Sequence, residues 1–379
     1  MSTLQKRFFM NDIEQLQKDA LALLKKLIAT RSFSREEDNT AAILEDFFID
    51  SGIPHQRHIN NVWAVNKYFD AAKPTVLLNS HHDTVKPNPK YTIDPYTPLE
   101  KDGKIFGLGS NDAGGCLVSL IATFRYFYDK ENLPFNIVMA CSAEEEISGA
   151  NGIEALLNFK GFLDSVDEVS FKEPKKSWCG IVGEPTQTEL AVAEKGLLVL
   201  DVTAHGKAGH AARSEGVNAL YRAVKEIEWF RTHHFDKKSE WLGKVKMTVT
   251  SVNTENKQHN VVPDSCHYVV DIRIPDCYAH EDILEIIRDN IESEIKPRNF
   301  RLKSSSIPVD HPIVAAGMAL GRKPFGSPTC SDKAFMQFPA LKCGPGDSAR
   351  SHTADEYIFI EEINNGIVFY IDMLNHAQF

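Results

Sequence analysis

The chain has 379 residues, of which 42% are hydrophobic and 25% are charged, and its formal net charge is -10. This length exceeds that of an ordinary domain and predicts two domains, and the composition is typical of a globular protein. The acidic balance argues against binding to nucleic acid or to an anionic membrane surface, because both require a basic footprint on the protein. We expect a small-molecule substrate instead.

The cysteines and the N-terminal residues predict where the protein resides. The seven cysteines are scattered, odd in number and never spaced as Cys-x-x-Cys, which is typical of neither a disulfide framework nor a cysteine-based zinc site. Residues 1–10 are polar and basic and lack the apolar centre of a signal peptide. No apolar run approaches the roughly 18 residues that a membrane span requires. We therefore expect a cytoplasmic protein.

Helical and extended patterns alternate in the first half of the chain. Asn11 with Glu14 resembles a capping box, and apolar residues then recur at helical spacing, which predicts a helix over 11–29. A second helix is expected over Thr40–Ser51, with Gly52 at its end. Short apolar runs predict strands at Val62–Val65, Thr75–Leu78, Phe135–Cys141 and Gly180–Val182. The alternation predicts an α/β layer around a mostly parallel, buried sheet.

A different order of elements begins after Gly196. Strand, helix, strand, strand, helix and strand are predicted in that order at Leu197–Ala204, Gly216–His233, Lys244–Val252, His267–Ile274, His280–Glu294 and Phe300–Ser306. This βαββαβ order is typical of a ferredoxin-like α+β module.

The return of helical periodicity near the C-terminus suggests how the domains are arranged. Helices are predicted at His311–Leu320 and Glu361–Leu374, as in the first half of the chain. We therefore predict a discontinuous larger domain of residues 1–192 and 307–379. The ferredoxin-like module, residues 193–306, is predicted to be inserted into it.

Side chains able to bind metals directly follow several predicted strands, where open α/β sheets collect their active sites. His81 follows the strand near residue 78, and Asp83 two residues later points the same way on an extended chain, where it can orient the imidazole. Asp112 lies among glycines that let the backbone approach an ion, and its two oxygens can bridge two metals. The alternatives are a surface loop with chance histidines and a plain helix cap. The spacing fits no phosphate-binding fingerprint.

Three further motifs add carboxylates and a histidine. Glu144, Glu145 and Glu146 directly follow an apolar strand, and such a cluster repels itself unless cations neutralise it. A solvated helix N-terminus is the ordinary explanation for an acidic triplet. Glu184 ends another apolar run, and His352 lies on a late loop. A turn and a helix cap would explain these two residues separately. Taken together, however, the motifs provide a complete set of potential metal ligands.

These five motifs, in this order and over nearly the whole chain, resemble those of a metallohydrolase family. The family includes acetylornithine deacetylase, succinyl-diaminopimelate desuccinylase, aminoacylase and carboxypeptidase G. The resemblance implies a catalytic domain with two divalent metal ions, for which zinc, with cobalt as a substitute, suits oxygen and imidazole ligands. By the same resemblance, one ion is bound by His81, Asp112 and Glu184, and the other by Asp112, Glu146 and His352.

The resemblance also implies a reaction, the hydrolysis of a linear amide without a covalent enzyme intermediate. Asp83 corresponds to the aspartate that supports the metal-binding histidine. Glu145 corresponds to the general base, which takes a proton from water and passes it to the leaving amine. Glu144 stands where the family usually has aspartate.

In the inserted domain, the segment 206–210 resembles a family element written GxxxH. Its histidine, here His210, helps to hold the oxyanion, commonly in the site of the neighbouring subunit. The resemblance implies a homodimer formed through the inserted domain, which also acts as a lid. Asn260 and Arg273 match positions that contact substrate, the arginine by pairing with the α-carboxylate. A turn amide and a salt bridge on the strand surface are the alternatives for these two residues.

The chain departs from the family in two places. Residues 329–332 read Thr-Cys-Ser-Asp where a Thr-Ser-Asp element is frequent, and the role of this segment stays open. Leu108 stands where many relatives have arginine.

The branch that the motifs resemble most is acetylornithine deacetylase, which would place the chain in arginine biosynthesis. Succinyl-diaminopimelate desuccinylase, an N-acetylcitrulline or N-succinylornithine deacylase, and a small-peptide metallopeptidase use the same centre and remain alternatives. A longer acyl carboxylate would need a second cation, for which Lys195, Arg213 and Arg350 are candidates. A non-catalytic binding protein and a metal-storage protein are alternatives from other classes. The complete ligand set and Glu145 count against both.

Overall fold

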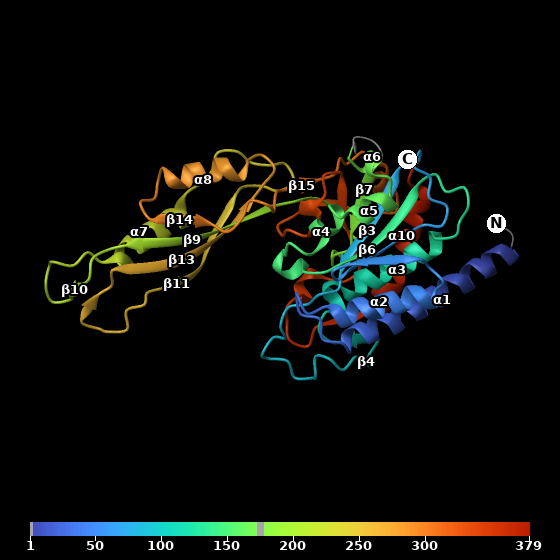
Figure 1. Ribbon diagram of the computed structural model, residues 1–379, viewed down its shortest axis with the longest axis horizontal. Helices are drawn as coiled ribbons and strands as arrows, with labels where there is room; N and C mark the ends of the chain where they lie inside the picture. The colour runs from blue at the N-terminus through green and yellow to red at the C-terminus, as the bar shows by residue number, and fades with distance from the viewer. Residues whose placement is uncertain (1–2, 173–177) are drawn as a thin grey trace. The chain divides into compact units, whose positions relative to one another are not determined.

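A computed structural model describes residues 3–172 and 178–379, which form two compact units (Figure 1). The first unit comprises residues 1–192, 306–325 and 331–379, and the second comprises residues 193–305 and 326–330.

Residues 326–330 belong to the second unit, whereas the sequence assigned them to the larger domain. Gly326 packs against Trp241 so closely that a Cβ there would lie 2.1 Å from the Trp241 carbonyl oxygen. The backbone N–H of Lys195 also donates to the carbonyl oxygen of Ser327 at 3.2 Å. Whether the two units are separate domains with the expected boundaries stays a prediction.

A nine-stranded sheet runs through the first unit in the order β1-β2-β6-β3-β7-β17-β8-β15, with β16 beside β8. The bounds are β1 (His55–His58), β2 (Asn61–Val65), β3 (Thr75–His81), β6 (Asn136–Ser142), β7 (Trp178–Val182), β8 (Leu190–Glu194), β15 (Ser305–Ser306), β16 (Pro324–Ser327) and β17 (Ala340–Lys342). Strands β6, β3, β7 and β17 are parallel, while β1, β2 and β8 pair antiparallel to their neighbours. The predicted buried sheet with a parallel centre is confirmed.

Helices cover both faces of this sheet, and its central strands β3 and β6 are buried throughout. Val76 and Leu78 on β3 pack into one cluster with α1, α2, α3, α9 and α10, while Leu77 packs into a second cluster with α4 and α5. The bounds are α1 (Thr3–Ile28), α2 (Asp38–Asp50), α3 (Gly115–Phe127), α4 (Ile153–Leu157), α5 (Lys160–Ser165), α6 (Glu168–Lys172), α9 (Pro312–Ala319) and α10 (Ile360–His376). Among residues 3–172 and 178–379, no helix is both long and apolar enough to cross a bilayer.

The predicted start of the first helix is wrong. Helix α1 begins at Thr3, so Asn11 lies within the helix rather than at its N-terminus. The preceding residues contain no glycine or proline and include several good helix formers, so nothing in the chain ends the helix there.

The second unit contains a four-stranded antiparallel sheet in the order β11-β13-β9-β14, with α7 and α8. Buried residues of β9 and β13 alternate with less buried ones and share a hydrophobic cluster with both helices. The bounds are β9 (Gly196–His205), β10 (Gly209–His210), α7 (Ala219–Thr232), β11 (Lys246–Asn253), β12 (Val261–Val262), β13 (Ser265–Ile274), α8 (His280–Arg288) and β14 (Glu294–Pro297). The predicted βαββαβ order is confirmed.

The end of that module differs from the prediction. Helix α8 ends at Arg288 instead of Glu294, and the last strand of the four-stranded sheet is β14 rather than 300–306. The buried carboxylate of Glu226 on α7 accepts the backbone N–H groups of Glu292 and Ser293 at 3.2 and 3.1 Å. These N–H groups therefore leave the helical hydrogen-bond pattern, and the chain turns into a strand earlier.

Candidate metal centre

Adjacent parallel strands end beside one another and carry the polar motifs. His81, the last residue of β3, lies opposite Ser142, the last residue of β6, and the acidic triplet begins two residues after Ser142. Strand β7 pairs with the other side of β3 and leads into Glu184. The carboxyl ends of the central strands thus gather an imidazole and several carboxylates at one edge of the sheet.

His81 is 1% exposed, and one of its ring nitrogens has no hydrogen-bond partner. Its Nδ1 lies 3.0 Å from the carbonyl oxygen of Asp83, to which it can donate. Its Nε2 is the unpartnered atom and lies 3.4 Å from Asp112 Oδ1 and 3.8 Å from Glu184 Oε1. Buried polar atoms are rarely left without a partner. A ring nitrogen that faces two carboxylates, with the other nitrogen held by a carbonyl, suits metal ligation.

A second group of potential ligands lies around Asp112. The Nε2 of His352 is 3.0 Å from Glu146 Oε2 and 3.7 Å from Asp112 Oδ2. In each of the two groups, one ligand atom from every residue lies within 4.8 Å of the others. Asp112 belongs to both groups, so the structure brings together the two ligand sets that the family resemblance implies. That they bind metal ions stays a proposal.

The buried carboxylates of this cluster also favour the binding of cations. Burial raises the pKa of Glu184 to about 8 and that of Asp332 to about 6. Burial, and then the charge of Glu184, raise the pKa of Glu145 well above its usual range. Carboxylates are buried together at such a cost only where a compensating positive charge is available. Two divalent cations bound by oxygen and nitrogen would provide it.

The turn that carries Asp112 is held by Glu356, which the sequence left without a role. Residues Ser110–Gly114 form a π-helical turn, η1. The Glu356 carboxylate is buried and accepts the backbone N–H groups of Gly109, Asn111 and Asp112 at 3.1, 2.8 and 2.9 Å. No local signal in the sequence reveals this contact, because Glu356 lies 244 or more positions from the residues that it holds.

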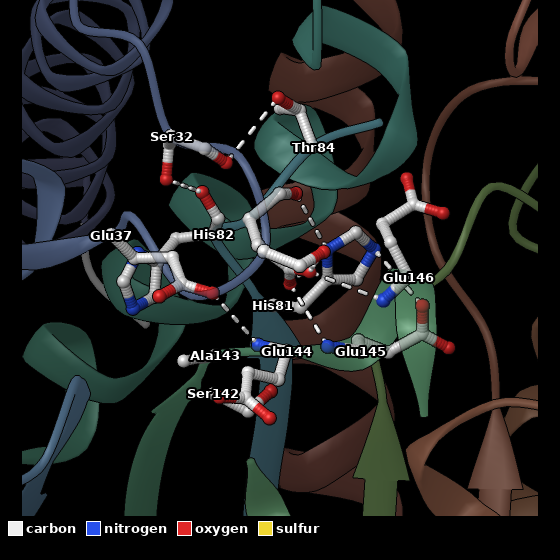
Figure 2. A network of polar contacts seen from close by, with 12 residues as sticks. Ser32, Glu37, His81, His82, Thr84, Ser142, Ala143, Glu144, Glu145 and Glu146 are labelled. Carbon is white, nitrogen blue, oxygen red and sulfur yellow. Dashed lines mark hydrogen bonds and ion pairs between the residues drawn. The ribbon is translucent and has the colours of Figure 1, made fainter. Parts of the chain in front are cut away.

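The acidic triplet is held in a similar way. Its second and third members begin the 3-10 helix η2 (Glu145–Ile147). The backbone N–H groups of Glu145 and Glu146 donate to the Asp83 carboxylate at 3.0 and 3.2 Å. The backbone N–H of Glu144 donates to Glu37 at 3.2 Å (Figure 2). Asp83 therefore contacts both His81 and the triplet, which extends the supporting role expected for it. The sequence did not single out Glu37.

Other residues of the motifs support the framework. His82 is buried between the Thr40 hydroxyl and the Asn60 carbonyl, each 2.9 Å from a ring nitrogen, and burial lowers its pKa to about 4. It is therefore a neutral structural histidine. Asp332, from the segment whose role stayed open, is buried and accepts a hydrogen bond from the Ser142 hydroxyl at 2.6 Å. Leu108 is buried.

The residues expected to contact substrate from the lid lie in two separate places within the second unit. His210 on β10 pairs with Val261 on β12, and the Ala211 N–H donates to the Asn260 carbonyl at 2.9 Å. Asn260 precedes the N-terminal end of β13, whereas Arg273 lies near the C-terminal end of that strand. Arg273 forms a bidentate ion pair with Asp271 at 2.8 and 2.9 Å. The structure thus brings His210 and Asn260 together and leaves Arg273 apart.

Two of the three candidate cations for a second carboxylate already have partners. Arg350 forms a bidentate ion pair with Glu362 at 2.8 and 2.5 Å. The Lys195 ammonium donates to the Lys244 carbonyl at 2.6 Å. Arg213 is exposed and follows His210 in a tight turn, in which its N–H donates to the His210 carbonyl at 2.8 Å.

The α/β fold and the sequence pattern together define a hydrolase of a known metallopeptidase class. The chain belongs to Peptidase family M20/M25/M40, whose pattern matches residues 77–376. The family resemblance and the predicted α/β fold are therefore confirmed.

Similar curated proteins include two succinyl-diaminopimelate desuccinylases. That of Orientia tsutsugamushi (strain Ikeda) is 25% identical over 302 residues, which cover 75% of this chain and 74% of the relative. That of Wolbachia pipientis subsp. Culex pipiens (strain wPip) is 23% identical over 384 residues, which cover 94% and 93%. These relatives bear the name of one of the alternatives, not that of the acetylornithine branch.

Solved structures with the same fold include two peptidases. Aminopeptidase PepT of Bacillus cereus ATCC 10987 superposes with a TM-score of 0.72 at 18% identity, covering 95% of this chain and 98% of its own. A dinuclear metal-binding peptidase of the M20 family from Bacillus subtilis superposes with a TM-score of 0.65 at 13% identity, covering 95% and 98%. At these identities the comparison concerns the fold.

The contacts of Glu356 predict how the Asp112 turn responds to a single exchange. In Glu356→Gln an amide NH₂ replaces one carboxylate oxygen, so an N–H of the turn loses its acceptor and Asp112 is less firmly placed. We expect the bound metal per chain, measured by elemental analysis after dialysis, to fall to half or less of the wild-type value. Asp355→Asn is the matched control, because Asp355 accepts hydrogen bonds from Thr92 instead. Equal metal content in both variants would show that Glu356 does not support the site.

Proposed function

We propose that the chain is a dinuclear metal-dependent amidohydrolase, zinc- or cobalt-containing, that removes an N-acyl group from a small amino acid. The observation that carries this proposal is the shared position of Asp112 between two ligand groups, with Glu145 beside them and in neither. His81, Asp112 and Glu184 would hold one cation, and Asp112, Glu146 and His352 the other. When bound, the cations would lower the pKa of water and polarise the acyl carbonyl.

The residues of the chain supply the proton transfer. Glu145 Oε2 lies 4.0 Å from His81 Nε2, so its carboxylate faces the same space as the ligands. In its ionised form, this carboxylate would accept a proton from the attacking water and return it to the leaving amine. Asp83 holds the backbone of Glu145 and thereby fixes the direction of this carboxylate.

Two acyl groups are candidates. The names of the similar desuccinylases and the exposed cation of Arg213 beside His210 favour an N-succinyl substrate, whose second carboxylate needs a cation. The Gly-Glu-Pro-Thr segment that includes Glu184 favours the second candidate, N-acetylornithine in arginine biosynthesis. The expected cytoplasmic location stays a prediction.

We further propose that the enzyme is a homodimer in which His210 serves the partner's site. Along β13, the eight residue-to-residue steps from Ser265 to Arg273 span roughly 26 Å, at about 3.3 Å each. His210 and Asn260 lie beyond the Ser265 end, so one chain cannot bring His210 and Arg273 to the same small substrate. Edge strand β11 and the exposed Tyr221 and Val224 of α7, 74% and 55% accessible, offer a surface for a second copy.

The role of Glu145 predicts a separation of metal binding from turnover. Glu145→Ala is expected to keep the bound metal and to lose at least about 100-fold in kcat, because proton transfer contributes that much or more. Elemental analysis and amide-hydrolysis assays measure the two quantities, with exposed Glu131→Ala as the control. Undiminished turnover with bound metal would rule out Glu145 as the base.

A substrate panel tests the reaction and the acyl group. N-acetyl amino acids, N-succinyl amino acids and dipeptides are assayed after chelation and after addition of zinc or cobalt. We expect hydrolysis to disappear on chelation, to return with the metal, and to show the highest kcat/KM for an N-succinyl amino acid. A higher kcat/KM for N-acetylornithine would select the second candidate, and hydrolysis that survives complete metal removal would reject the metal-dependent reaction.

Subunit complementation tests the shared site. His210→Ala and His81→Ala are each expected to be inactive. After unfolding and joint refolding, the mixture should regain roughly a quarter of wild-type activity, because half of randomly formed dimers carry one complete site. If the mixture stays as inactive as its components, His210 does not act across the dimer.

A further inference from the structure

Glu37 is a fully buried carboxylate outside both ligand groups. We propose that Glu37 is a positioning residue of the general-base turn, which holds the Glu144 amide and thereby sets the direction of Glu145 and Glu146. This inference rests on the proposed amidohydrolase function. Glu37 lies 107 positions before Glu144 and belongs to none of the metal-binding motifs.

The contacts of Glu37 point away from its own helix. It occupies the N-cap position of α2, yet its side chain makes no capping hydrogen bond, and glutamate is not among the residues that favour this position. Its Oε1 instead accepts the backbone N–H of Arg35 at 2.6 Å and that of Glu144 at 3.2 Å, and its Oε2 accepts the Asn60 side-chain amide at 2.9 Å. Helix capping therefore does not explain why a carboxylate is buried here.

The turn that receives this contact needs external support. Glu144 has a φ of 53° and Ser148 a φ of 48°, left-handed values that residues other than glycine adopt at an energetic cost. Three successive N–H groups of the triplet point to two buried carboxylates, Glu37 for the first and Asp83 for the next two. Figure 2 shows the Glu37 carboxylate facing the Glu144 nitrogen.

The same network reaches the other strand end. The Asn60 side chain donates to Glu37, and the Asn60 carbonyl lies 2.9 Å from His82 Nε2. Because His82 follows His81 directly, Glu37 connects the N-terminus of α2 to the ends of both β3 and β6. A change at Glu37 should affect Glu145 and Glu146 first, because Glu37 contacts their turn directly at the Glu144 N–H.

The test compares apolar and conservative exchanges at Glu37. In Glu37→Leu the Glu144 N–H loses its acceptor, and we expect kcat to fall 10- to 100-fold with KM within threefold of wild type. Chelator should also remove metal several-fold faster than from wild type, a readout independent of turnover. Glu37→Gln keeps one acceptor oxygen and should restore most of kcat. Asp38→Leu is the matched control, because Asp38 is the next residue and pairs with Arg57 at the surface.

Several outcomes would overturn the inference. They are wild-type kcat and metal release in Glu37→Leu, or an equal loss of kcat in Asp38→Leu. If Glu37→Leu does not fold, Glu37→Asp takes its place, because its shorter side chain withdraws the oxygens from Glu144, and the same fall in kcat is expected. An inactive wild type on every amide substrate would reject the proposed function instead, so the two failures are distinguishable.

Discussion

The buried negative charge around Asp112 is the constraint on which the rest of the first unit depends. Carboxylates from η1, η2 and the segment after β7 lie within a few ångströms of one another and of two histidines. When largely buried, such a cluster is unstable unless cations join it and each carboxylate is fixed in direction. The support residues serve this second requirement. Glu356 holds the Asp112 turn, Asp83 holds His81 and the triplet, and Glu37 holds the start of the triplet.

The parts of this site that depend on local sequence patterns could be predicted from the sequence, whereas contacts between residues far apart in the chain could not. The ligands follow short apolar runs, and parallel strands meet at one edge, so local patterns and the family resemblance were sufficient to group them. The supporting contacts join residues far apart in the chain: Glu37 is 107 positions from Glu144, and Glu356 is 245 from Asn111. Nothing in the local pattern around Glu37 or Glu356 records these partners. The predicted extension of α8 to Glu294 is wrong for the same reason, because Glu226 on α7 accepts the backbone N–H groups of Glu292 and Ser293.

The second unit illustrates how an element can be predicted correctly while its role stays a proposal. Alternating burial along β9 and β13 made the ferredoxin-like order predictable from period-two patterns. The positions of His210 and Arg273 at opposite ends of the sheet follow from that order and from strand length. Their separation supports the proposed dimer, because one small substrate could not contact both residues of the same chain. The ion pair of Arg273 with Asp271 means that any carboxylate it binds must share or displace that partner.

The central claim is that two cations share Asp112. Anomalous diffraction at the zinc edge from crystals grown with zinc tests it most directly. Two peaks are expected, about 3.5–4 Å apart as in other two-metal sites, one contacted by His81 and Glu184 and the other by Glu146 and His352, with Asp112 between them. A single peak, or peaks bound by other residues, would contradict it.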